Sequence, residues 1–196
     1  MNHSVLQSFR FPEGTCIAQA QPLLSTVVTL ESPGVEVMTD LTKIKAATIQ
    51  PGMSLNQAKQ TMIYQGVRLL FVVETMPCVE GLITSTDLEG DRPMQVIAQR
   101  GIRYEELLVS DVMSGLSSLD AVDYDDLCHH STVGKVIATL KNVGRRHLLV
   151  VQKASIDAPA RIRGVISQTQ IERQLGRTID AGEIASTFAE IRQALA

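Results

Sequence analysis

The sequence has few aromatic residues and little net charge. Its 196 residues include no Trp, four Phe and three Tyr, so there is little material on which nucleic-acid bases can stack. The formal net charge of −3 provides no basic field to attract a phosphate backbone. We therefore expect no nucleic acid among the partners of this protein.

Long hydrophobic runs and a secretory start are also missing. The longest apolar runs, Leu69–Val73 and His147–Val151, have the length of strands and fall short of the roughly 20 residues of a membrane helix. The N-terminus, Met1–Ser4, lacks a basic start followed by an apolar stretch. These features predict a cytoplasmic protein that does not span a membrane.

Cysteine is scarce. Cys16, Cys78 and Cys128 are odd in number, far apart and without the spacing of a metal or redox motif. Free thiols in a reducing cytoplasm are the simplest interpretation.

What the sequence does contain is an internal repeat. Leu55–Val73 can be laid over Val133–Val151 at an offset of 78 residues. Downstream, Gly81–Thr84 matches Gly164–Ser167 at an offset of 83, and the five extra residues fall in the segment Gln152–Arg163. Insertions of this kind are typical of loops. The chain is therefore two copies of one unit.

The repeat extends upstream, where Val37–Thr39 matches Val112–Ser114 at an offset of 75. Each copy then has apolar residues at helical spacing, behind a residue suited to cap a helix. These helices begin after Ser54 in copy one and after Ser131 in copy two.

Strands follow each helix. Gly66 and Gly144 stand where a helix commonly ends in a left-handed residue, and an apolar strand comes next. Each copy is also expected to have a short strand before its helix and a second strand after a turn. These four strands are expected near Ala46–Ile49, Ala121–Tyr124, Val79–Thr84 and Ile162–Ser167.

The predicted fold is therefore α/β (α+β), with two β-α-β-β-α repeats. One such unit is too small to cover its own sheet. Two units packed about a pseudo-two-fold axis cover each other and leave clefts where strand ends and helix starts converge.

This order resembles the CBS domain, named after cystathionine β-synthase, and two such domains in tandem are called a Bateman module. The residues that carry it are the Val-Met-Thr/Ser motif, the amphipathic helix, the strand after the helix, and Gly-Leu-Ile-Thr-Ser-Thr-Asp at 81–87. The resemblance covers about Val35–Gly176. The expected parts are an N-terminal extension at 1–34, repeat 1 at 35–92, a connecting segment at 93–109, repeat 2 at 110–177, and a C-terminal amphipathic helix at 178–196.

The resemblance implies a regulatory adenosine-type nucleotide, AMP, ADP, ATP or S-adenosylmethionine, and no required cofactor. It places a hydroxyl near the phosphates and a carboxylate on the ribose, roles that fall to Thr84 and Asp87, with Ile83 beside them. A carboxylate can accept hydrogen bonds from both vicinal ribose hydroxyls. The corresponding second site would use Ser167, which keeps the hydroxyl, and Gln170, which departs from the family's pattern by replacing the carboxylate.

A second interpretation of both motifs stays open. A Thr or Ser followed three residues later by an acidic or amide side chain also forms a capping box, which starts a helix without any ligand. Both copies satisfy this pattern. The family resemblance favours a ligand site in copy one, whereas we favour a simple cap in copy two.

Basic residues suited to phosphate precede one strand in each copy. They are Arg68 in copy one, which would serve the second site, and Arg145, Arg146 and His147 in copy two, which would face a nucleotide held by copy one. The alternative is that the arginines stay solvated or complement a helix C-terminus.

Lys43 and Ile44 match the segment with which family members surround the adenine. The spacing from Met38 to the following strand varies in the family, so the matching positions follow from the resemblance alone.

Metal and catalytic signals are weak. The segment Asp123–His130 contains plausible ligands, but it lacks ligand spacing and is expected to be a polar loop. We found no nucleophile motif, phosphate-binding Gly-Lys loop or dinucleotide fingerprint, so we expect no enzyme.

The two ends have their own patterns. Ser25–Leu30 is strand-like. The segment after Asp180 presents one apolar helical face, made of Ile184, Phe188, Ile191 and Leu195. This face is expected to pack on its own module or to contact another chain, since family members often form homodimers.

Two functional hypotheses remain. The first is a stand-alone regulatory module that binds nucleotide and passes a conformational or oligomeric change to an unidentified protein partner. The second is a ligand-free interaction or scaffold protein with a vestigial cleft.

Overall fold

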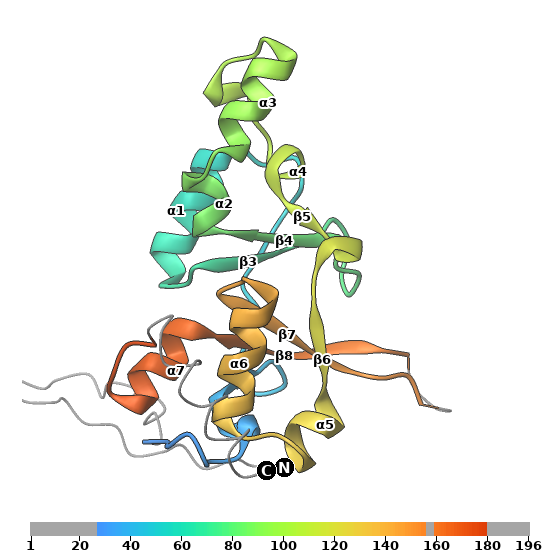
Figure 1. Ribbon diagram of the computed structural model, residues 1–196. Helices are drawn as coiled ribbons and strands as arrows, with labels where there is room; N and C mark the ends of the chain where they lie inside the picture. Colours follow the sequence, from blue (N-terminus) through green and yellow to red (C-terminus); the bar gives the residue numbers. More distant parts are fainter. Residues whose placement is uncertain (1–26, 156–158, 180–196) are drawn as a thin grey trace, which may run out of the picture.

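Two β-sheets face each other at the centre of the molecule, and helices cover the outer face of each sheet (Figure 1). This computed structural model describes residues 27–155 and 159–179. The four-layer arrangement is the mixed α/β fold that the duplicated pattern predicts. Within the described ranges, no helix is long and apolar enough to cross a membrane.

Both copies have the expected β-α-β-β-α order. The elements of copy one are β2 (Thr48–Ile49), α1 (Leu55–Gln65), β3 (Leu69–Val72), β4 (Gly81–Thr84) and α2 (Ser85–Glu89). Those of copy two are β6 (Ala121–Asp123), α6 (Val133–Val143), β7 (His147–Gln152), β8 (Arg161–Ser167) and α7 (Gln168–Leu175).

Further short elements precede and connect the copies. They are η1 (Gly34–Val37), β1 (Met38–Asp40), α3 (Arg92–Arg100), η2 (Tyr104–Glu106), α4 (Val109–Val112), β5 (Ser114–Gly115), η3 (Leu116–Ser118) and α5 (Tyr124–His129). The last of these corrects an expectation, because the acidic segment before α6 is a helix and not a loop. The side chain of Asp123 starts it by accepting the N–H groups of Asp125 and Asp126.

The main helices begin and end close to the expected residues. Ser54 caps α1 and forms a capping box with Gln57. In copy two the cap is Thr132 and not Ser131, which corrects the prediction by one residue. Gly66 and Gly144 end α1 and α6 with φ angles of 65° and 68°, a left-handed conformation that glycine adopts without a Cβ penalty.

The copies exchange their first strands. β1, which opens copy one, pairs with β8 of copy two, and β5, which opens copy two, pairs with β4 of copy one. The sheets therefore run β1-β8-β7-β6 and β2-β3-β4-β5. Equivalent residues make equivalent pairs, Thr39 with Val165 and Ser114 with Leu82. Neither sheet is complete without a strand from the other copy.

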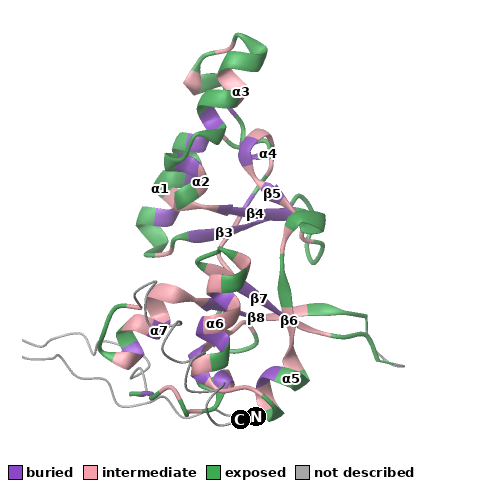
Figure 2. Cartoon of the chain, in the orientation of Figure 1, coloured by how far each residue is buried: buried purple, intermediate pink, exposed green. Residues whose placement is uncertain are grey.

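Alternation along each strand separates three hydrophobic cores. In β3, Leu70 and Val72 face the helices of copy one, whereas Leu69 and Phe71 face the opposite sheet. The shared core between the sheets combines residues of both copies, namely Leu69, Phe71, Val73, Leu82, Leu149 and Val165. Figure 2 shows the buried residues along the central strands, with exposed ones on the outer helices.

The ends fall mostly outside the described residues. Of the strand expected at Ser25–Leu30, the described part, 27–30, is not a strand, although Val28 is buried and its N–H donates to the carbonyl of Gln174 at 3.1 Å. The apolar face predicted for 180–196 lies outside the described residues. Ile179, just before it, packs against the core of copy two.

Candidate functional site

Thr84 and Asp87 form one hydrogen-bonded unit where β4 becomes α2. The N–H and the hydroxyl of Thr84 both donate to Oδ2 of Asp87, at 2.8 and 2.7 Å, and the Asp87 N–H donates to Thr84 Oγ1 at 3.3 Å. The capping box is thus formed. Among the described residues, Oδ1 of Asp87 has no hydrogen-bond partner, so one carboxylate oxygen keeps its capacity to accept.

The strand pleat turns Thr84 toward copy two. Leu82 belongs to the shared core between the sheets, whereas Ile83 is fully buried in the core of copy one. Because side chains alternate along a strand, Thr84 shares the face of Leu82. Ile83 therefore supports the site from behind, on the side of the helices.

Copy two has a weaker version of the same cap. Ser167 Oγ accepts the N–H of Gln170 at 3.1 Å at the start of α7. The Asp87 carboxylate accepts a hydrogen bond from the backbone N–H of its cap residue, but Gln170 accepts no such bond within the described chain. The substitution of amide for carboxylate thus changes both the charge and the hydrogen bonding of this position.

His147 occupies the position in copy two that Leu69 occupies in copy one. It lies directly opposite Ser167 in the β7–β8 ladder, just as Leu69 lies opposite Thr84 in the β3–β4 ladder. Alternation places its ring on the face of Leu149, a residue of the shared core. The imidazole therefore faces copy one.

The charges around His147 come from both copies. Burial lowers the pKa of the imidazole, and the nearby Asp87 carboxylate opposes this shift. The guanidiniums of Arg146 and Arg68 add to the lowering. His147 thus lies in the electrostatic field of Asp87 and Arg68, as expected for a site that both copies build.

Arg68 and Arg146, which correspond to each other in the repeat, bind the first residues of α2 and α7 through their backbone carbonyls. The carbonyl of Arg68 accepts the N–H of Ser85 at 3.0 Å, and the carbonyl of Arg146 accepts the N–H of Gln168 at 2.9 Å. The side chain of Arg68 is exposed and has no hydrogen bond or ion pair within the described ranges.

Arg145 and Arg146 contribute to a different feature. Both line a cavity of about 250 Å³ between the end of α6 and the start of α7. Arg145 also donates from Nη2 to the carbonyl of Ser118 at 2.9 Å, and its Nε lies 3.7 Å from Oδ2 of Asp120. The structure therefore directs these arginines to copy two and the linker before it.

Lys43 and Ile44 lie in an exposed turn after β1. Their N–H groups both donate to the carbonyl of Asp40 at 3.0 Å. Nη2 of Arg163 donates to Oδ2 of Asp40 at 3.0 Å. Arg163 lies near the start of β8, whereas Ser167 is the last residue of that strand. Ile44 remains 42% exposed, which leaves apolar surface for contact with a flat ring.

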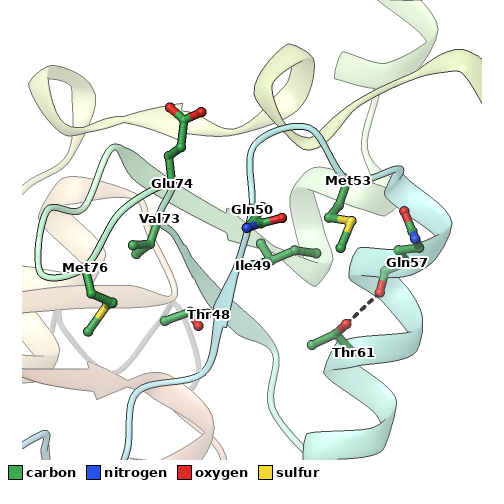
Figure 3. Close-up of a pocket in the computed structure, with 9 residues that line it drawn as sticks. All are labelled: Thr48, Ile49, Gln50, Met53, Gln57, Thr61, Val73, Glu74 and Met76. Carbon is green, nitrogen blue, oxygen red and sulfur yellow. Dashed lines mark hydrogen bonds between the residues drawn. The ribbon is translucent and has the colours of Figure 1, made fainter.

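A cavity that the sequence did not indicate lies beside α1. It has a volume of about 360 Å³, and Figure 3 shows its lining residues Thr48, Ile49, Gln50, Met53, Gln57, Thr61, Val73, Glu74 and Met76. None of them belongs to the expected nucleotide site. The Thr61 hydroxyl is already bonded to the carbonyl of Gln57, at 2.8 Å.

The segment considered for metal binding shows no ligand arrangement. His130 Nδ1 lies 3.6 Å from Oδ1 of Asp126, one turn earlier on the chain. In the part of the chain that the structure describes, no group of three or more His, Cys, Asp or Glu side chains is placed to hold a metal ion.

Comparisons with known proteins agree with this fold. Residues 35–89 match the sequence family described as CBS domain. No curated protein matches the chain. An uncharacterized conserved protein from Pyrococcus horikoshii has a similar structure, with 17% identity, a TM-score of 0.53, and coverage of 79% of this chain and 100% of that one.

Two further solved structures are similar. A protein with CBS domains from Burkholderia ambifaria MC40-6 has 16% identity and a TM-score of 0.50, over 70% of this chain and 88% of that one. The CBS domain of a bacterial CNNM/CorC family Mg²⁺ transporter, in complex with an inhibitor, has 15% identity and a TM-score of 0.50, over 77% and 81%. At these identities the similarity shows the fold alone.

Proposed function

Since residues 35–89 are a CBS domain and the described chain has the fold of CBS-domain proteins, we propose that this protein is a regulatory module that binds an adenosine-type nucleotide between its two copies. The ribose is held by Asp87, and the phosphates lie near Thr84, His147 and Arg68. No catalytic role is part of the proposal.

One observation carries it. Three groups without hydrogen-bond partners among the described residues are involved. Oδ1 of Asp87 and the His147 imidazole lie where the two sheets face each other, and the guanidinium of Arg68 is near enough to lower the pKa of His147. The acceptor suits sugar hydroxyls, and the other two groups suit phosphate oxygens. A fold without a ligand gains little from bringing a carboxylate, an imidazole and a guanidinium together without direct pairs.

The test is calorimetric titration of the full chain with AMP. Asp87→Asn keeps a side-chain oxygen for the cap but removes the charge, and we expect AMP affinity to fall about tenfold or more. Gln170→Ala, the matched change in copy two, is expected to leave AMP affinity unchanged. Equal AMP affinity in the native protein and in Asp87→Asn would remove the assigned site.

A second titration addresses stoichiometry. Gln170→Asp restores a carboxylate and a full capping box in copy two, next to Ser167. We expect the native chain to bind a single AMP and this variant to bind a second one. Unchanged stoichiometry would mean that the carboxylate is insufficient to create a site.

The scaffold hypothesis has support of its own. Oδ2 of Asp87 is fully used by the cap, which is the arrangement that a ligand-free helix start requires. Light scattering with and without AMP separates the two functions. A scaffold keeps the same mass and thermal stability at every nucleotide concentration, whereas a sensor is stabilised by bound ligand.

We also propose a homodimer located in the cytoplasm. Helix α1 exposes Ile63 and Tyr64, at 64% and 92%, which is apolar surface that a second copy can cover. Cys78 and Cys128 are free thiols, in keeping with a reducing compartment. A measured mass of one chain at micromolar concentration would contradict the dimer.

A further inference from the structure

The cavity between α6 and α7 has a basic rim. Its lining consists of Ile137, Leu140, Lys141, Gly144, Arg145, Arg146, Gln168 and Ile179. Three of these residues are cationic and none is acidic. The side chain of Arg146 makes no hydrogen bond or ion pair within the described ranges, so its five donors are available.

Two carboxylates bond to residues that line the cavity. Glu172 Oε1 accepts from Nε2 of Gln168 at 2.9 Å and from the N–H of Ile179 at 3.2 Å, so it braces the cavity wall. Asp120 lies 3.7 Å from Arg145 Nε, on the linker side. Asp120 offsets part of the charge of Arg145, whereas Arg146 has no acidic partner within the described ranges and gives the cavity its positive charge.

The floor of the cavity is apolar. Ile137 and Leu140 are core residues with 7% and 3% of their surface exposed, and Ile179 is half-buried against the same core. A basic rim above an apolar floor is complementary to a small molecule that has an anionic group and an apolar body.

Copy one shows that the basic rim is not a requirement of the fold. At the offset of 78 residues, Lys141 corresponds to Ile63 and Arg145 to Val67. Only Arg146 has a basic counterpart, Arg68. The same helix end thus folds in copy one without these additional cations.

The volume limits the ligand. At about 250 Å³, the cavity is smaller than the roughly 300–1,000 Å³ of sites that bury drug-sized ligands. Its lining includes neither Thr84 nor Asp87, which separates this cavity from the proposed nucleotide site. A carboxylate or phosphate monoester with one small apolar group is of the right size.

We propose that this cavity is a second ligand site, which binds a small organic anion through Arg145 and Arg146 and buries its apolar part on Ile137 and Leu140. Guanidinium forks bind the oxygens of carboxylates and phosphates in the same bidentate manner. The site belongs to copy two alone and does not depend on nucleotide binding at Asp87.

The test is calorimetric titration of the full chain with phenyl phosphate, with benzyl alcohol as the neutral analogue. We expect phenyl phosphate to bind and benzyl alcohol not to bind detectably. Arg146→Gln and Arg145→Val, the second of which introduces the residue of copy one, are each expected to weaken phenyl phosphate about tenfold. Thermal unfolding of each variant verifies that it is folded.

Lys59→Gln is the control, because Lys59 is an exposed cation of α1 that lines neither cavity and is not part of the proposed nucleotide site. It is expected to leave phenyl phosphate affinity unchanged, and saturating AMP is expected to do the same. Weakening by Lys59→Gln, displacement by AMP, indifference to both copy-two variants, or no binding of phenyl phosphate would each overturn the proposal. Failure of AMP to bind would contradict only the nucleotide proposal.

Discussion

The two copies have the same fold but differ in the residues around it. Copy one has a complete capping box between Thr84 and Asp87, whereas Ser167 in copy two makes only one of the two bonds with Gln170. Conversely, copy two places His147 where copy one has Leu69, and it adds the cationic rim above α6. The duplication keeps the residues that start helices and fill cores, and it varies those that face a cleft or a cavity.

The largest effect is expected in the shared core. Phe71 is 3% exposed between the sheets, and Phe71→Ala should lower the free energy of unfolding by about 3–5 kcal/mol. Leu149→Ala, from the other sheet, should cost about 2–5 kcal/mol. Urea unfolding followed by circular dichroism measures both. Because the copies exchange strands, we expect one transition; two separate transitions would contradict their interdependence.

A second comparison concerns Gly81 and Gly164, which face the exchanged strands. A Cβ on Gly81 would overlap the backbone carbonyl of Ser114 in β5, so the strand itself must move. A Cβ on Gly164 would meet the Met38 side chain, with Sδ at 2.5 Å, and the carbonyl oxygen of Thr39 at 2.9 Å, so its overlap with backbone is smaller than that of Gly81. We expect Gly81→Ala to cost about 3 kcal/mol and Gly164→Ala about 1 kcal/mol, measured by urea unfolding. The reverse order would show that the exchanged strands differ in rigidity.

The helix caps provide a smaller effect. Thr84→Ala removes a hydroxyl that makes two hydrogen bonds in the box and should cost about 1–2 kcal/mol, whereas Ser167→Ala removes a hydroxyl that makes one and should cost about 0.5–1 kcal/mol. Chemical denaturation of the ligand-free protein compares them. Equal costs would indicate that the hydrogen bond from the Thr84 hydroxyl to Oδ2 of Asp87 adds nothing to stability.

The smallest expected effect is the pH dependence that His147 contributes. Burial lowers the pKa of His147 in the folded protein, although Asp87 offsets part of this shift. The His147 imidazole therefore binds a proton more readily in the unfolded chain than in the folded protein. The contribution of neutral His147 to the free energy of unfolding is fully present above about pH 6.5 and decreases as the pH falls below this value. His147→Leu, which copies Leu69, should remove this part of the pH dependence.

The same histidine connects stability with ligand binding. A phosphate near His147 stabilises the protonated ring, so AMP affinity should increase as the pH falls from about 7.5 to 6. Titrations in buffers of different ionisation enthalpy would detect the proton that is taken up. AMP binding without proton uptake would place the phosphate away from His147.

Most of the local structure could be predicted from the sequence. Helical spacing located α1 and α6, and Gly66 and Gly144 located their ends, because these signals depend on neighbouring residues only. The acidic helix α5 was missed because its short sequence resembles a polar loop, although Asp123 followed by two acidic residues was available as a start signal.

The site was predictable in part. Thr84 and Asp87 form a unit within one turn, so sequence spacing alone brings them together. The cation that faces Thr84 and Asp87 could not be predicted in this way. His147 and Arg146 are adjacent in the chain, but their side chains lie on opposite faces where β7 begins. Their environments depend on the sheet that packs against β7, and no local pattern contains that information.

The amino-acid sequence by itself determined the duplication, the order of elements in each copy and the helix caps, since periodicity and short-range hydrogen bonds act within a few residues. Only the tertiary structure decided that β1 pairs with β8 and β5 with β4. It also decided that His147 rather than Arg145 lies in the electrostatic field of Asp87, and that a basic cavity forms between α6 and α7. A strand pattern states which face is apolar, but the partner that covers this face is selected by the packing of the whole chain.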